Sequence, residues 1–183
     1  MKKIIMYLNP GFEETEAVSV CDILKRADIV VDIVSTTNDL EVTGAHSITI
    51  KADKLWKDIN INDYDGMFLP GGSGVMSLVG NQRMIDQILH FNSQNKLIAS
   101  ICAAPQIIGQ TKLLDNKNVS YFPGCNQFLE NSNYVKKAFA TENNIITGAS
   151  MGSAILFGLE LVRYLKGEQI SKQLENNLVI LGK

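Results

Sequence analysis

KLIASICAAP, residues 96–105, joins a short apolar run to a turn of small residues. The run at 96–101 is typical of a fully buried strand, because both of its alternating faces are apolar. The stretch AAPQIIGQTKLL, residues 103–114, follows at once and predicts a helix. A strand that passes directly into a helix is the repeating unit of α/β folds. This stretch therefore indicates an α/β protein, with Cys102 at the turn between the two elements.

The same alternation continues on both sides of this stretch. We expect buried strands at 3–8, 29–35 and 66–70, and helices at 13–27, 82–92, 152–167 and 169–177. We also expect a short hairpin over 41–53 and strand pieces at 119–122, 135–140 and 144–147. Strands that are apolar on both faces and alternate with helices predict one mostly parallel sheet with helices on both faces. A chain of 183 residues fits a single domain, residues 1–183.

The composition argues against several classes of protein. A formal net charge of -2 offers no basic surface for nucleic acid or an anionic membrane, and no apolar run approaches the roughly 20 residues that span a bilayer. The start, MKKIIMYLNPGFEETE, turns acidic after Pro10, which fits a first strand better than a signal peptide. Three cysteines without a CxxC pair and two distant histidines favour neither a disulfide framework nor a zinc site. We therefore expect a cytoplasmic protein without a metal or cofactor.

Three loops follow buried strands at one edge of the predicted sheet: NPGFEETE, LPGGSG and SICAAP. In such sheets ligands bind beyond the carboxyl ends of the strands, so these loops mark the candidate site. Cys102 in the third loop has two interpretations. It is either a buried core thiol, as free cysteines often are, or a nucleophile at a sharp turn, where the first amides of the next helix favour a thiolate. The GxSxG sequence of a nucleophile elbow is absent.

The other two loops also have an ordinary and a chemical interpretation. LPGGSG is a plain tight turn, or its backbone N–H groups form an oxyanion hole beside Cys102. It contains neither a P-loop nor GxGxxG. Glu13 and Glu14 are expected to stabilise the N-terminus of the first helix, because their negative charges interact favourably with the positive end of the helix dipole. Glu16 points to a different face, where a buried carboxyl beside a thiol would be a general acid/base.

The remaining candidates are weaker. Cys21 lies on the apolar face of the first helix, where core packing is the better interpretation. Cys125, in FPGCNQF, is either an exposed thiol with a redox role or a loop residue without a chemical role. His90 is expected on a helix surface. His46 lies in the predicted hairpin, and the single chain does not place it near Cys102.

GFEETEAV, LPGG and ASICAAP, in this order and at these separations, resemble the DJ-1/ThiJ/PfpI superfamily. The branch most similar is that of the parkinsonism-associated protein deglycase and the bacterial ThiJ-like proteins. The resemblance runs from the first strand to the last helix and includes YDGMFLPGG, FPG and TGASMGSAILFGLELV. Each motif alone is modest, but the combination is specific.

The resemblance implies a flavodoxin-like three-layer sandwich and a homodimer without a cofactor. It implies the reactive cysteine at Cys102 and, at Glu16, the acid that hydrogen-bonds its sulfur. The substrate-binding and oxyanion-type backbone groups it implies are those of Gly71, Gly72 and Ala103. A basic residue from the dimer partner would reach the neighbouring site; the matching position is His46, with Arg26 as a second basic candidate.

The sequence departs from the superfamily pattern at three positions. Proteases of the superfamily carry a histidine after the cysteine, and here Ala103 stands there, so a protease triad is not expected. Phe122 replaces a histidine of the branch, which leaves the identity of a general base open. Ala149 replaces an arginine, which argues against anion binding at that position.

The activity that the resemblance implies is chemistry on reactive dicarbonyls, as a glutathione-independent glyoxalase (a lyase) or a deglycase (a hydrolase) acting on glycated amino groups, with a protective role in oxidative stress. A redox-sensing stress protein or chaperone that uses oxidation of Cys102 is the alternative. A thiamine-pathway role is a weaker alternative, because no phosphate site is apparent. A non-catalytic module would require an inert, buried Cys102. Catalytic turnover and oxidation of Cys102 would use the same residues, so both functions remain as alternatives at this point.

Overall fold

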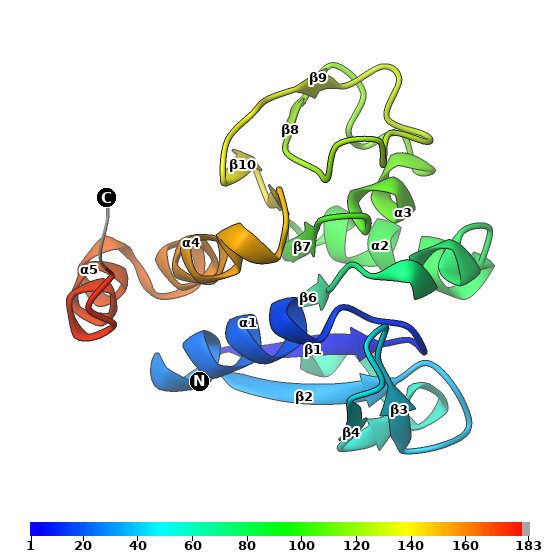
Figure 1. The fold of residues 1–183 in the computed structure, drawn as a ribbon, viewed down its shortest axis with the longest axis horizontal. Helices are drawn as coiled ribbons and strands as arrows, with labels where there is room; N and C mark the ends of the chain where they lie inside the picture. The colour runs from blue at the N-terminus through cyan, green and yellow to red at the C-terminus, as the bar shows by residue number, and fades with distance from the viewer. Residues whose placement is uncertain (181–183) are drawn as a thin grey trace.

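The computed structural model describes residues 1–180, so the last three residues of the predicted domain 1–183 lie outside the described residues. Its centre is a sheet that has seven strands within the described part, in the order β10-β11-β7-β6-β1-β2-β5 (Figure 1). The strands are β1 (Lys3–Leu8), β2 (Val30–Ser35), β5 (Lys54–Leu55), β6 (Gly66–Leu69), β7 (Leu97–Ile101), β10 (Phe139–Glu142) and β11 (Ile145–Gly148). Neighbours are parallel except for the antiparallel pair β10–β11, which confirms the mostly parallel sheet.

Helices cover both faces of this sheet, and β1 shows why. Alternate side chains of a strand point to opposite faces. Ile4 and Met6 of β1 pack into the core beneath α1 and α4, whereas Ile5 and Tyr7 pack into the core on the side of α2 and α3. The helices are α1 (Glu14–Arg26), α4 (Ala154–Lys166) and α5 (Glu168–Asn177) on the first face, and α2 (Gln82–Ser93) and α3 (Pro105–Gly109) on the second. The flavodoxin-like three-layer sandwich is therefore confirmed.

Short elements connect these layers. The predicted hairpin is present as β3 (Glu41–Thr43) and β4 (Thr49–Lys51), paired antiparallel. Short 3-10 helices lie at η1 (Trp56–Asp58), η2 (Ile61–Asp63), η3 (Ser73–Leu78) and η4 (Met151–Ser153). Among the described residues, no helix is long and apolar enough to cross a membrane.

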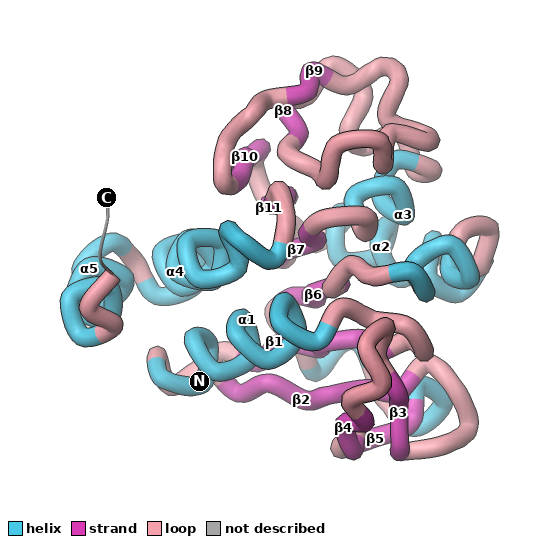
Figure 2. Tube along the Cα trace, viewed as in Figure 1, coloured by secondary structure: helices cyan, strands magenta, loops and turns pink. Residues whose placement is uncertain are grey.

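The segment after β7 differs from its prediction. The helix expected over 103–114 is present only as α3, because the chain then turns and Lys112 takes a left-handed φ of 61°. The strand expected at 119–122 is the short β8 (Asn118–Val119), which pairs with β9 (Asn133–Tyr134) outside the main sheet. The strand expected at 135–140 begins later, as β10. Figure 2 shows that loops make up most of the chain between α3 and β10.

Candidate active site

Cys102 lies directly after β7 and holds an unusual backbone conformation. Its φ is 64°, in the left-handed region, where a side chain with a Cβ is strained by on the order of 1–3 kcal/mol. Two hydrogen bonds hold it there: its N–H donates to the Gly148 carbonyl at 2.9 Å, and its carbonyl accepts from the Phe122 N–H at 2.9 Å. Such strain concentrates at functional sites. The half-buried thiol is therefore held at a sharp turn, at the edge of the core beneath α1 and α4.

Glu16, in the first turn of α1, brings a fully buried carboxyl to this turn. Its Oε2 accepts from the Gly71 N–H at 2.8 Å, and its Oε1 has no hydrogen-bond partner among the described residues. The carboxyl interacts with the Cys102 sulfur. Burial raises the pKa of Glu16 to about 7, against the opposing effects of the Gly71 N–H and Cys102. A carboxyl with this pKa exchanges protons near neutral pH.

Cys102 and Glu16 titrate as a pair. Burial raises the pKa of the Cys102 thiol, and the negative charge of Glu16 raises it further, while the Ala103 N–H lowers it. The helix N-terminus that the sequence suggested as a thiolate stabiliser does not outweigh these effects. The reason is that α3 is short and begins only at Pro105. When Glu16 takes up a proton, its negative charge is lost, and with it the part of the rise in the Cys102 pKa that this charge causes.

The glycine loop after β6 forms the wall beside the sulfur. A Cβ added to Gly71 would lie 2.7 Å from the Cys102 Cβ, 2.9 Å from Glu16 Oε2 and 3.0 Å from the Ala103 N. The structure thus brings Gly71, Ala103, Glu16 and Cys102 together. Gly72 has a φ of 101°, and a Cβ there would lie 2.3 Å from the Gly11 carbonyl oxygen, so only glycine fits. None of the backbone hydrogen bonds found in residues 1–180 uses the Gly72 N–H.

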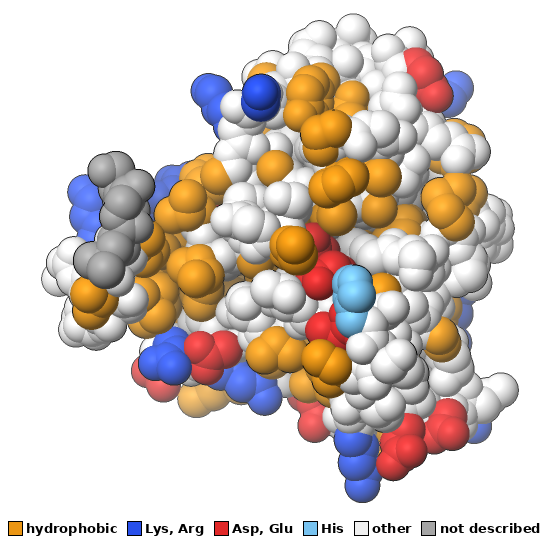
Figure 3. All heavy atoms as spheres, viewed as in Figure 1, with side chains coloured by type: hydrophobic (Ala, Val, Ile, Leu, Met, Phe, Trp, Pro, Cys, Tyr) orange, Lys and Arg blue, Asp and Glu red, His pale blue; other side chains and the backbone are white. Residues whose placement is uncertain are grey.

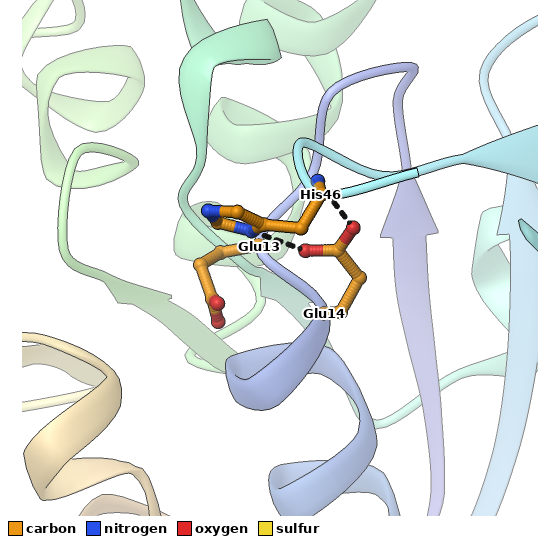
Figure 4. Close-up of side chains that lie close together, drawn as sticks. All are labelled: Glu13, Glu14 and His46. Carbon is orange, nitrogen blue, oxygen red and sulfur yellow. Dashed lines mark hydrogen bonds and ion pairs between the residues drawn. The ribbon is translucent and has the colours of Figure 1, made fainter. Parts of the chain in front are cut away.

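His46 contacts the same helix turn from the hairpin of its own chain. Its backbone N–H donates to Glu14 Oε1 at 2.6 Å, and its Nδ1 lies 2.9 Å from Glu14 Oε2. Figure 4 shows the His46 ring next to Glu13 and Glu14, with dashed lines to Glu14 alone. Burial acts to raise the pKa of Glu14, but the hydrogen bonds from His46 outweigh it and lower that pKa. The contact with Glu14 in turn raises the pKa of His46, whose side chain is exposed.

Glu13, Glu14 and His46 are also of the types that bind metal ions. One ligand atom from each lies within 4.8 Å of the others, a grouping that the sequence did not suggest because His46 is far along the chain. Both Glu14 oxygens already accept hydrogen bonds, and Glu13 Oε2 accepts from the Glu16 N–H at 2.8 Å. Glu14 and His46 thus connect α1 to the hairpin, and Glu13 caps the helix, which explains the three side chains without a metal.

The other candidates lie apart from the sulfur within this chain. Arg26 is at the far end of α1, about 18 Å along the helix from Glu14, and pairs with Asp22 at 2.6 Å. Cys21 is buried in the core, as predicted. His90 lies near the end of α2, where it is half-buried and its ring packs against Phe91.

Two positions near the site were missed by the sequence reasoning. The backbone of Met151, which precedes α4, lies close enough to Glu16 to lower its pKa. Gln106 is buried and joins the turn after Cys102 to a distant loop, by donating to the Ala103 carbonyl and accepting from the Gln127 N–H. No local pattern identifies such contacts, because they depend on how distant segments pack.

Exposed apolar side chains surround the first turns of α1. Val18, Ile48, Met151 and Ile155 are each about half exposed, with relative exposures between 45% and 57%. Figure 3 shows apolar side chains on this face around a small group of acidic ones. Exposed apolar patches of this kind mark surfaces that contact partners.

Comparison with known proteins gives consistent matches. A model of the DJ-1/PfpI family matches residues 2–164. The chain is 28% identical to the glutathione-independent glyoxalase DJ-1 of Schizosaccharomyces pombe, over 98% of this chain and 96% of that protein. It is also 28% identical to Protein DJ-1 homolog B of Arabidopsis thaliana, over 97% of this chain but only 41% of that longer protein. The crystal structure of Drosophila melanogaster DJ-1beta superimposes with a TM-score of 0.92 at 27% identity, over 99% of both chains.

Proposed function

Because this chain belongs to the DJ-1/PfpI family, we propose that it is a cysteine-dependent enzyme that converts reactive dicarbonyls to hydroxy acids without glutathione. The same chemistry on a dicarbonyl already attached to an amino group would release the free amine and the hydroxy acid. The observation that supports the proposal is that Cys102, held at its left-handed turn, and the buried Glu16 carboxyl both lie beside Gly71, within 3 Å of where its Cβ would be. A nucleophile and a proton carrier with a pKa of about 7 are the two groups that this reaction needs.

The reaction begins with addition of the Cys102 sulfur to the aldehyde carbon. The thiol proton moves through Glu16 to the carbonyl oxygen, which gives a hemithioacetal. Glu16 then removes the proton from the former aldehyde carbon, and the resulting enediol takes a proton back at the neighbouring carbon. The product is a thioester on Cys102, and water hydrolyses it to the hydroxy acid and the free thiol. Atoms balance as one dicarbonyl plus one water.

Backbone N–H groups would stabilise the oxygen that becomes negative in the first step. The Ala103 N–H lies beside the sulfur, and the Gly72 N–H donates no hydrogen bond to the described part of the chain. The Gly71 N–H is not available for this, because it donates to Glu16. We assign the oxyanion role to Gly72 and Ala103 on this ground. Ala103 also supplies no imidazole, so a protease triad is not proposed.

A homodimer is part of the proposal. The apolar side chains around α1 offer a self-complementary surface, since the same patch on a second copy would bury them. His46 lies on this face and is exposed, so it can contribute to the site of a partner while it bonds Glu14 in its own chain. Arg26 lies at the far end of the same helix, where it would contact a partner away from the sulfur.

The test is lactate formed from methylglyoxal without glutathione. The wild type, Cys102→Ser and the control Cys21→Ser are compared, because Cys21 is a buried thiol that interacts with Lys25 and not with Cys102. We expect lactate from the wild type and from Cys21→Ser, and none from Cys102→Ser. Glu16→Gln should lower turnover by about 100-fold or more, because it cannot carry the proton. Lactate at the same rate from Cys102→Ser would refute the proposal.

The redox alternative is favoured by one observation. Glu16, protonated up to a pKa of about 7, lies against the sulfur and can donate a hydrogen bond to an oxidised form of it. This function would require no turnover. Mild peroxide that converts Cys102 to a sulfinate, in a protein that makes no lactate, would favour it over the enzyme.

A further inference from the structure

The segment 122–127 is connected by hydrogen bonds, at both of its ends, to the turn that carries Cys102. At one end the Phe122 N–H donates to the Cys102 carbonyl at 2.9 Å. At the other end the Gln127 N–H donates to Gln106 Oε1 at 3.1 Å, and Gln106 Nε2 donates to the Ala103 carbonyl at 3.0 Å. Gln106 is buried, and both of its hydrogen bonds are partly buried. The segment 122–127 therefore lies against the turn that carries the nucleophile.

Cys125 lies inside this fastened segment. Its N–H donates to the Phe122 carbonyl at 2.9 Å, and Gly124 has a φ of 91°. With proline before that glycine, these are the features of a type II turn, which brings the Cα atoms of Phe122 and Cys125 within about 7 Å. Phe122 is itself bonded to Cys102, so two consecutive hydrogen bonds connect the backbones of the two cysteines.

Both thiols have the accessibility that thiol chemistry needs. Cys102 and Cys125 are each partly exposed, whereas Cys21 is buried in the core. Cys125 is also close enough for its charge to affect the titration of Cys102. The sequence alone gave two interpretations of Cys125: an exposed thiol with a redox role, or a loop residue without a chemical role. Its place over the nucleophile supports the first interpretation.

We propose that Cys125 is the resolving thiol of Cys102, so that oxidation of the nucleophile ends in an internal Cys102–Cys125 disulfide. The oxidant is a hydroperoxide. The Cys102 thiolate attacks its outer oxygen, the O–O bond breaks, and the leaving oxygen takes a proton from Glu16, which yields a sulfenic acid. The Cys125 sulfur then attacks the Cys102 sulfur and displaces hydroxide, which leaves as water with the Cys125 proton. A dithiol reductant restores both thiols by exchange.

This disulfide would turn the site off reversibly. Cys102 could not add to a carbonyl while bonded to Cys125, and it would be protected from irreversible oxidation to a sulfinate. The inference shares with the proposed function the nucleophilic character of Cys102 and the role of Glu16 as a proton donor. Its test follows the sulfur atoms directly, so it does not depend on any turnover.

The experiment treats the full chain with a small excess of hydrogen peroxide and follows intact mass and non-reduced peptides. Wild type, Cys125→Ala and the control Cys21→Ala are compared. We expect the wild type and Cys21→Ala to lose the mass of two hydrogens, with the peptides of Cys102 and Cys125 joined, and dithiothreitol to reverse this. Cys125→Ala should instead gain two oxygen atoms at Cys102 and not recover.

Two results would overturn the inference. One is sulfinate on Cys102 at the same rate in the wild type and in Cys125→Ala. The other is a disulfide that joins Cys102 to another chain. Lactate formation is measured on the same untreated samples. Lactate formation without a disulfide would support the proposed enzyme and refute the resolving role of Cys125. A disulfide without lactate formation would support the resolving role and refute the proposed enzyme.

Discussion

Replacing Glu16 by glutamine should change stability in a way that depends on pH. The wild-type carboxyl is fully buried, and burial raises its pKa from an ordinary value of 4.5 to about 7. Glutamine has nearly the same shape, can still accept from the Gly71 N–H through its carbonyl oxygen, and never ionises. The substitution therefore removes a buried charge while it retains the packing.

The sign follows from proton uptake. Between pH 4.5 and about 7 the folded protein holds the Glu16 proton and the unfolded chain does not, so the free energy of unfolding falls as pH rises through this range. A pKa difference of this size corresponds to about 3 kcal/mol, which the wild type has lost above neutral pH. Glu16→Gln should thus be more stable than the wild type at alkaline pH, by up to about 3 kcal/mol. For a chain of this length that is roughly 6–12 °C in Tm.

Thermal unfolding at a series of pH values measures this difference. We expect the Tm gap to be largest near pH 8 and to vanish near pH 4, where Glu16 is protonated in the wild type. Glu14→Gln is the matched control with the opposite sign, because His46 lowers the pKa of Glu14 and its carboxylate stabilises the fold above that pKa. A gap between wild type and Glu16→Gln that does not change with pH would refute the assignment of a raised pKa.

Two further predictions concern Gly71, which lies beside Cys102, and the buried side chain of Gln87. Gly71→Ala places a Cβ 2.7 Å from the Cys102 Cβ, so it should lower kcat/KM for lactate formation by about 100-fold, whereas Gly152→Ala, whose Cβ meets nothing nearer than 3.8 Å, should leave it unchanged. Equal kcat/KM in both variants would contradict the packing argument. Gln87→Leu removes the acceptor that the buried Tyr7 and Trp56 side chains share, and denaturant unfolding should show a loss of at least about 2 kcal/mol; a change below about 0.5 kcal/mol would refute the role of this network.

Much of the fold could be predicted from the sequence, because the sheet strands are short apolar runs bounded by turn residues. Those at 3–8, 66–69 and 97–101 carry almost only buried side chains, so period and length alone identify them. Prediction failed after β7, where α3 ends at Gly109. A Cβ at Gly109 would lie 2.4 Å from the Phe128 carbonyl oxygen, a contact made by a loop nearly twenty residues later. Such contacts have no local signature.

The candidate site was predictable in part for the same reason. Strand order in a parallel sheet brings the loops after β1, β6 and β7 together, so Glu16, Gly71 and Cys102 could be grouped from the sequence. The titration of the thiol could not be predicted, because it depends on burial and on the distance to Glu16. The contact of His46 with Glu14 depends on how the hairpin packs, which the sequence does not reveal.

The first turn of α1 also limits where this chain can vary in length. Each acid there has a separate partner: Glu13 caps the helix, Glu14 holds the hairpin, and Glu16 meets the sulfur. Inserting or deleting one residue within Glu13–Glu16 would rotate the following side chains by about 100° around the helix axis relative to the preceding ones, so the three contacts could not all be kept. Insertions before Gly11 or after α1 would not. Length differences among chains that keep this chemistry are therefore expected outside this turn.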